Sequence, residues 1–138
     1  MNFFTKIKEA SQRNDSLLCV GLDPVETILP KGPDIFSRLV GWGRDLISRT
    51  ADYACCFKPN IAFYEQFGVE GIRALIEILQ AVPSYLPVLL DAKRGDIGSS
   101  AEAYARGAFD HFHVDAITLS PYLGGDSVRA FLTDEDKA

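Results

Sequence analysis

Cysteine and histidine are scarce in this sequence, and long apolar runs are missing from it. The 138 residues include three cysteines, two of them adjacent as Cys55 and Cys56, and two histidines. This is a poor disulfide framework with no CxxC pair for a metal ion, so we expect all three cysteines to fill the core in a reducing compartment.

No stretch approaches the ~20 apolar residues of a membrane span. The amino terminus carries Lys6, Lys8 and Glu9 where a signal peptide would be apolar. We therefore expect a cytoplasmic protein with no membrane partner.

Positive charge is also in short supply. Lysine and arginine number 14 against 19 acidic residues, which gives a formal net charge of -5. A surface for nucleic acid or an anionic membrane needs clustered cations, so neither is an expected partner. The glycines form no dinucleotide-binding loop, and no linker rich in Ser, Gly or Pro divides the chain. With 47% hydrophobic and 24% charged residues, we expect residues 1–138 to form a single folded domain.

Each predicted strand is followed by polar residues. Apolar runs predict strands at residues 17–22, 53–57, 86–90 and 115–119. The polar residues at their carboxyl ends are Asp23, Lys58, Asp91 with Lys93, and Ser120. Because catalytic groups gather at the carboxyl ends of the strands in a (β/α)₈ barrel, we predict an α/β fold of this TIM-barrel family. A complete barrel needs about 250 residues, so the chain is expected to hold about four βα units, a half barrel, without strands five to eight.

Helical periodicity separates these strands. It predicts a first helix capped by Asn2 that plugs the bottom of the fold, and helices at about residues 34–51, 71–82 and 99–109. Ser99 and Glu102 have the spacing of a capping box, and Asp126 is expected to cap a short last helix.

The chemistry of the chain is concentrated in residues 88–100, where an apolar strand gives way to acids and bases. Side chains alternate between the two faces of a strand, so Asp91 and Lys93 are expected to point to the same side. Arg94 and Gly95 predict a turn that brings Asp96 back toward the same mouth. Opposite charges this close favour each other's ionised form. The set is either functional or an ordinary ion pair at a strand end.

Two motifs in this order resemble one known family. The pattern Asp91-x-Lys93-x-x-Asp96-Ile97-Gly98 is similar to the signature of the orotidine 5'-phosphate decarboxylases, and Phe57-Lys58-Pro59-Asn60 resembles the second catalytic segment of that family. Residues 16–24 and 120–124 also resemble the family, particularly its longer bacterial branch. The likeness covers nearly the whole chain, yet the later loops that grip phosphate in this family have no counterpart in it.

The resemblance implies a decarboxylation without metal or organic cofactor, in which a pyrimidine nucleotide loses its carboxylate. Lys93 would then donate the proton to the carbanion-like ring centre and stabilise its developing charge. Asp91 would lie against the departing carboxylate. Lys58 would bridge the ribose hydroxyls and Asp91.

The resemblance also implies a homodimer, because in this family Asp96 comes from the partner subunit. Asp96 would complete an alternating quartet with Lys58, Asp91 and Lys93. Ile97 and Ser100 would contact the nucleotide in the partner's site, with Ser100 standing where the family usually has threonine.

Two further residues are expected to touch the nucleotide. Asp23 is an acceptor that suits ribose hydroxyls or the pyrimidine edge. Ser120 lies at the mouth, where it either contacts the ligand or only supports a turn before Pro121.

Two weaker patterns have ordinary explanations. His111-x-His113 with Asp115 could form a metal site, but it lies at the amino end of a strand, so no metal is expected. Gly124 and Gly125 could cradle a phosphate or simply form a turn.

Two other functions stay open beside the leading one. A magnesium-dependent sugar-phosphate decarboxylase of the same superfamily shares the Asp-x-Lys-x-x-Asp pattern, although residues 57–60 favour the nucleotide enzyme. A non-catalytic half-barrel fragment is the third possibility. Without the loops that bind phosphate, we expect the 138-residue chain alone to be inactive or nearly so, because remote binding also drives the reacting group.

Overall fold

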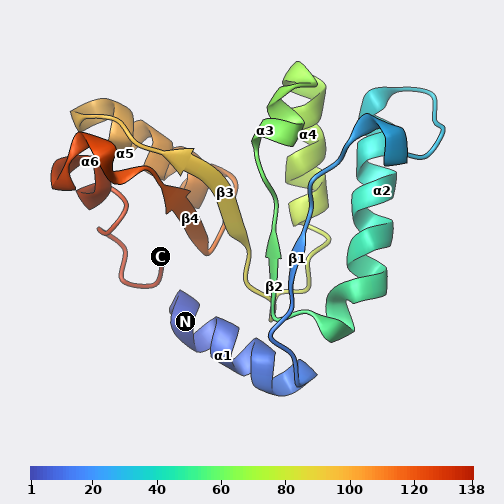
Figure 1. The fold of residues 1–138 in the computed structure, drawn as a ribbon, viewed down its shortest axis with the longest axis horizontal. Helices are drawn as coiled ribbons and strands as arrows, with labels where there is room; N and C mark the ends of the chain where they lie inside the picture. The colour runs from blue at the N-terminus through green and yellow to red at the C-terminus, as the bar shows by residue number, and fades with distance from the viewer.

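The computed structural model describes residues 1–138 and shows four parallel strands in sequential order (Figure 1). The strands are β1 (Cys19–Gly21), β2 (Cys56–Lys58), β3 (Leu89–Arg94) and β4 (Ala116–Leu119). In the ladders, Cys19 lies opposite Cys56 and Leu89 lies opposite Ala116. Single bridges from Phe57 to Val88 and from Asn60 to Asp91 join the two pairs. The order β1-β2-β3-β4 with helices after the strands is half of an α/β barrel, as the sequence predicted.

The first helix closes the amino-terminal end of the sheet. Helix α1 (Phe3–Asn14) begins where the Asn2 side chain accepts a hydrogen bond from the Thr5 amide at 2.9 Å, so the predicted cap is confirmed. The helix lies across the amino ends of β1 and β2 (Figure 1) and buries Ala10. Lys6 reaches from it to Asp115, just before β4, at 2.8 Å.

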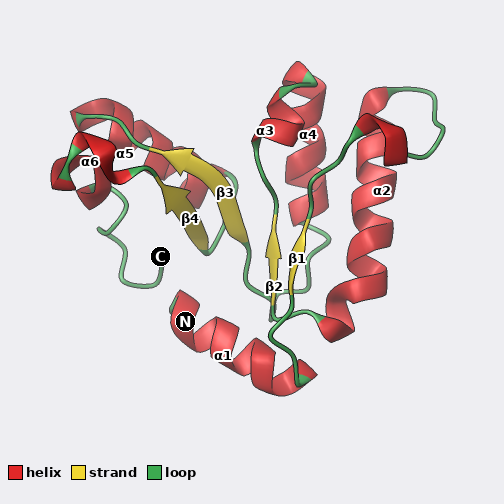
Figure 2. Cartoon of the chain, viewed as in Figure 1, coloured by secondary structure: helices red, strands yellow, loops and turns green.

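Helices α2 (Ile35–Thr50) and α4 (Gly68–Leu79) stand side by side on the outside of β1 and β2 (Figure 2). Gly43 of α2 permits their close packing, because a Cβ there would run into the Ile78 side chain. The predicted helix at 71–82 is present as α4, but it begins and ends three residues nearer the amino terminus. It is preceded by the short α3 (Ala62–Glu65), which the sequence pattern did not predict.

The first two strands are shorter than predicted. Leu17 is 89% exposed and lies outside β1. Tyr53 belongs to a 3-10 turn that follows α2, and the chain becomes extended only after this turn. Cys55 and Cys56 are buried as expected, whereas Cys19 is exposed, so the prediction that all three cysteines fill the core is wrong for Cys19.

The capping predictions for the last two helices are wrong. Helix α5 (Gly98–Arg106) begins before Ser99, which lies inside the first turn, and no side chain caps it. Helix α6 (Gly125–Arg129) begins after Gly124, whose φ of 108° makes the turn, and Asp126 lies in its first turn without capping it. Glycine backbone geometry therefore begins both helices.

Strand β3 is longer than predicted and contains the charged segment that the sequence placed beyond the strand. The predicted strand at 86–90 becomes Leu89–Arg94, and Asp91 lies within it. The main core lies between the sheet and the helices and includes Phe57, Tyr64 and Leu90.

At the outer edge of β4, the amide of Ile117 donates to the carbonyl of Ala138 at 2.8 Å, and the Ala138 amide donates to the backbone carbonyl of Asp115 at 3.1 Å. Ala138 thus pairs with β4 as a parallel strand would.

None of the helices combines the length and apolar character required to cross a bilayer.

Candidate active site

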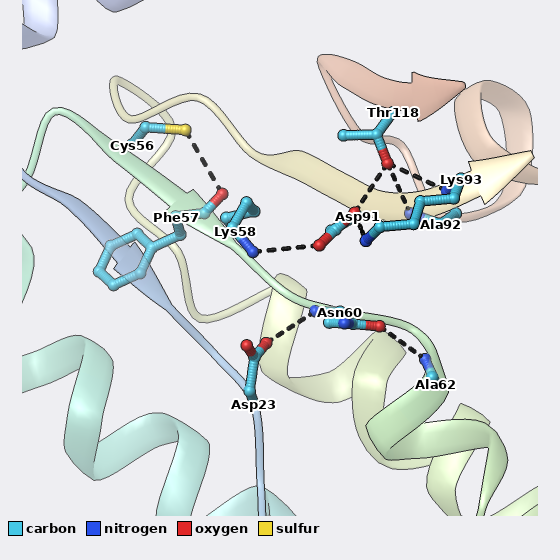
Figure 3. Close-up of polar contacts among 10 residues, drawn as sticks. All are labelled: Asp23, Cys56, Phe57, Lys58, Asn60, Ala62, Asp91, Ala92, Lys93 and Thr118. Carbon is cyan, nitrogen blue, oxygen red and sulfur yellow. Dashed lines mark hydrogen bonds and ion pairs between the residues drawn. The ribbon is translucent and has the colours of Figure 1, made fainter. Parts of the chain in front are cut away.

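Asp91 is the centre of a polar network at the carboxyl ends of three strands (Figure 3). Its side chain is only 12% exposed. One carboxylate oxygen accepts hydrogen bonds from Lys93 Nζ at 2.6 Å and from Thr118 Oγ1 at 2.8 Å. The other oxygen accepts from Lys58 Nζ at 3.3 Å. Strands β2, β3 and β4 therefore deliver two cations and one hydroxyl to a single carboxylate, which confirms that Asp91 and Lys93 share a face.

This environment keeps Asp91 ionised. The hydrogen bond from Lys93 is the main cause that lowers the pKa of Asp91 to about 2. Burial of the carboxyl group opposes the shift, and Thr118 and Lys58 add to it. At neutral pH the group is thus a carboxylate that only accepts hydrogen bonds.

The backbone at Lys93 is bent to aim its amine at the mouth of the half barrel. Its φ of 48° lies in the left-handed region, which non-glycine residues adopt rarely. The β3–β4 register shifts between Leu90 and Arg94, as it does at a β-bulge. The Lys93 side chain is 67% exposed although it is bonded to the buried Asp91. The bulge thus leaves the ammonium group open to a ligand.

Gly95 lets the chain leave the site close to β4. A Cβ at this position would collide with the carbonyl oxygen of Ser120. The Ser120 amide donates to the Arg94 carbonyl at 2.7 Å, which ties the two strand ends together. On the outer side, the Arg94 guanidinium binds Glu65 at 2.8 Å and lies over the Tyr104 ring.

Asp23 is held beside the network by the loop that follows β2. Its carboxylate accepts a hydrogen bond from the Asn60 amide at 2.9 Å (Figure 3). The backbone before it is anchored by the buried Tyr64 hydroxyl, which donates to the Leu22 carbonyl at 2.8 Å. Burial raises the pKa of Tyr64, so this phenol stays protonated and keeps donating. Asp23 is therefore placed at the same edge as Lys58, as the strand pattern predicted.

The remaining predicted residues lie near the mouth but outside this network. Asp96 accepts a hydrogen bond from the amide of its neighbour Ile97 at 2.7 Å and forms no ion pair within the chain. Ile97 and Ser100 are exposed at the start of α5, and Ser120 is partly buried after β4. Three members of the predicted quartet thus meet within one chain, and Asp96 does not join them there.

Two residues of the alternative metal pattern are surface groups. His111 and His113 are exposed, and Asp115 is bonded to Lys6 and to the Val88 amide. No group of three or more His, Cys, Asp or Glu side chains is arranged to hold a metal ion. Gly124 forms the turn before α6.

Sequence reasoning missed Thr118. Its hydroxyl donates to Asp91 and accepts hydrogen bonds from the amides of Ala92 at 3.1 Å and Lys93 at 3.0 Å. The only signal was a single hydroxyl between Ile117 and Leu119 in an apolar strand, which is ordinary in β structure.

Comparison with known proteins identifies the family of the chain. The model of the orotidine 5'-phosphate decarboxylase / HUMPS family matches residues 16–138. The chain belongs to this family. The similar proteins include the orotidine 5'-phosphate decarboxylase of Herpetosiphon aurantiacus, which is 50% identical over 98% of this chain and 51% of its own length. The corresponding enzyme of Thermomicrobium roseum is 43% identical over 99% of the chain and 49% of its own length.

A solved structure of the family shares the fold. The OMP decarboxylase of Leishmania donovani matches with a TM-score of 0.89 and 48% identity, over 100% of this chain and 52% of that one. The chain therefore spans about half the length of the family members that it matches, with the half-barrel architecture expected for that part.

Proposed function

We propose that this chain supplies the amino-terminal half of an orotidine 5'-phosphate decarboxylase, which forms uridine 5'-phosphate in pyrimidine synthesis without a cofactor. The observation that carries the proposal is the Lys58–Asp91–Lys93 array, two cations on one buried carboxylate at the carboxyl ends of adjacent strands. Membership of the family and the named functions of its similar members support it.

The array suits the departure of a carboxylate followed by protonation. Lys93 is the one exposed ammonium bonded to Asp91, and in this proposal it would stabilise negative charge on the ring carbon and then donate a proton to it. Asp91 would lie against the carboxylate that leaves as CO₂. Lys58 would hold Asp91 and the ribose hydroxyls in one arrangement.

Asp23 and Ser120 would bind the rest of the nucleoside. The Asp23 carboxylate has one oxygen on the Asn60 amide and is free to accept from a ribose hydroxyl with the other. The Ser120 hydroxyl donates no hydrogen bond within the chain and is partly exposed beside β4. The phosphate would be bound by the carboxyl-terminal half of the barrel.

The test joins residues 1–138 to the carboxyl-terminal half of the Herpetosiphon aurantiacus relative. We expect this chimaera to decarboxylate orotidine 5'-phosphate, as followed by loss of substrate absorbance, and we expect residues 1–138 alone to show almost none. The second half without residues 1–138 is the matched control. An inactive but folded chimaera would refute the proposal.

Chelation separates the nucleotide enzyme from a magnesium-dependent sugar-phosphate decarboxylase of the same superfamily. Activity of the chimaera should survive excess EDTA, because the proposed reaction uses the charged side chains of the array and no metal ion. Loss of activity on chelation, with recovery on adding magnesium, would favour the sugar-phosphate reaction.

We further propose a cytoplasmic homodimer whose sites are shared. Asp96, Ile97 and Ser100 lie exposed or partly exposed near the mouth, and Asp96 has no cation partner in its own chain. Asp96 would complete the array of the other subunit, with Ile97 and Ser100 against its nucleotide. The three free cysteines, one of them exposed, suit a reducing cytoplasm.

Subunit mixing tests the shared site. Asp96→Ala and Lys93→Met chimaeras should each be nearly inactive, and mixing them should restore activity, because one site of each mixed dimer then keeps both residues. Two Lys93→Met preparations with different tags provide the control. No recovery on mixing, with exchange of subunits verified, would place Asp96 outside the partner's site.

A further inference from the structure

The hydroxyl of Thr118 makes all the hydrogen bonds that it can form with three residues of β3, namely Asp91, Ala92 and Lys93. A threonine hydroxyl has one proton to donate and two lone pairs that accept. The amides of Ala92 and Lys93 are donors only, and both point at Thr118 Oγ1, at 3.1 and 3.0 Å. They occupy both lone pairs, so the hydroxyl proton is directed to Asp91, whose oxygen lies 2.8 Å away.

The direction of this hydrogen bond matters for the carboxylate. Thr118 has no lone pair left to accept a proton from Asp91, so it can only donate, and a donated hydrogen bond favours the carboxylate over the neutral acid. Lys93 and Lys58, the two charged groups that contact Asp91 from β3 and β2, favour the same form. Thr118 thus contributes from β4 a bias that is independent of charge.

The same oxygen also holds the backbone that aims Lys93. Lys93 has a φ of 48°, a conformation that persists only when its surroundings fix it. Its amide is bound to Thr118 and its ammonium to Asp91, which is itself bound to Thr118. Both ends of the lysine therefore depend on one hydroxyl.

We propose that Thr118 is a positioning residue of the decarboxylase site, which fixes the β3 bulge and thereby holds the Asp91 carboxylate and the Lys93 ammonium in place at the substrate. This inference rests on the proposed function for its catalytic part. Its structural part, the control of Asp91 and of the two amides, stands without it.

The decisive comparison is between Thr118→Val, which keeps the shape and loses the hydroxyl, and Thr118→Ser, which keeps the hydroxyl and loses the methyl group. In the chimaera, we expect Thr118→Val to lower kcat by roughly 10²-fold, the order of loss that small misplacement of a reacting group causes. KM should change by less than about threefold, because the Thr118 hydroxyl is fully engaged with Asp91 and the β3 backbone. Thr118→Ser should stay within about threefold of the parent in both constants.

A second measurement on residues 1–138 needs no activity. Carboxyl ¹³C titration by NMR should show the pKa of Asp91 raised in Thr118→Val and unchanged in Thr118→Ser. Amide exchange should become faster at Ala92 and Lys93 in the valine variant alone. If the chimaera is inactive, these readouts still decide the role of Thr118 while the proposed function fails.

Unchanged kcat in Thr118→Val would overturn the catalytic part, and an unchanged Asp91 pKa with unchanged amide exchange would overturn the structural part. Equal losses in the valine and serine variants would show a packing role instead and would also overturn the proposal. Should Thr118→Val fail to fold, Thr118→Ala is measured in its place with the same expected direction for each readout.

Discussion

Two aspartates at opposite ends of the β3–β4 pair show how one kind of ion pair serves two purposes. Asp115, before β4, accepts from Lys6 at 2.8 Å and from the Val88 amide at 2.8 Å, and the Lys6 side chain is 19% exposed. Asp91, in β3, is equally sheltered, but its partner Lys93 is 67% exposed. The amino-terminal pair is closed by α1, whereas the carboxyl-terminal pair is open to a ligand.

This difference follows from the architecture of an α/β barrel. The amino ends of the strands are covered by packing, and the carboxyl ends carry loops that are free to vary. Lys6 therefore links α1 to the sheet, and we expect it to contribute to the free energy of unfolding. Lys93 is kept in a strained backbone conformation at a bulge. Such conformations cost stability and occur where function requires them.

The sharpest test of the comparison is removal of the exposed amine. Lys93→Met keeps most of the side chain but removes the charge, so we expect kcat of the chimaera to fall by about 10³-fold or more, within the range for loss of a proton donor that also stabilises charge. The melting temperature should fall less than in a Lys6→Met variant, because Asp91 keeps Lys58 and Thr118 as partners. Steady-state kinetics and thermal unfolding measure both, and full activity would remove Lys93 from the mechanism.

The converse change should affect stability and spare activity. Lys6→Met leaves the Asp115 carboxylate, 17% exposed, with only one amide partner. We expect a loss of about 2 kcal/mol in the free energy of unfolding, somewhat below the cost of breaking a fully buried pair. Adding Asp115→Asn should restore part of it. Urea unfolding of residues 1–138 checks this, and a large drop in kcat of the chimaera would contradict the division between the two ends.

The smallest expected effect is a change in the pH slope of the stability, at most about 1.4 kcal/mol per pH unit. The pKa of Asp91 is about 2 in the fold, below the value of about 3.9 for an unfolded aspartate. Its ionised form therefore stabilises the fold above pH 4 by at most about 2 to 3 kcal/mol, and most of this contribution is lost as the pH falls toward 2. Unfolding free energies measured between pH 5 and pH 2 should decline less steeply in Asp91→Asn. Identical slopes would mean that the carboxylate is not stabilised in the fold.

Much of the fold could be predicted because it depends on short-range periodicity. Apolar runs followed by polar residues located all four strands, and the two-residue spacing placed Asp91 and Lys93 on one face. Asn2 was recognised as a cap because capping involves neighbours three residues apart. The caps of α5 and α6 were misassigned, since the backbone of Gly98 and Gly124 begins these helices and competes with nearby polar side chains.

The part of the candidate site that depends on where each strand ends was predicted correctly. Lys58, Asp91 and Lys93 come together as the strand ends required, and Asp23 lies beside them. Asp96 does not join them, because the chain turns it toward its own Ile97 amide.

The sequence by itself determined the alternation of strand and helix, the face that Asp91 and Lys93 share, and the edge where polar groups gather, because each depends on residues close together in the chain. Only the tertiary structure decided that Thr118 would bind Asp91, 27 residues away, and that β3 would bulge to expose the Lys93 amine. Such contacts arise from the register between strands, and no local pattern encodes a register that the packing of the whole sheet selects.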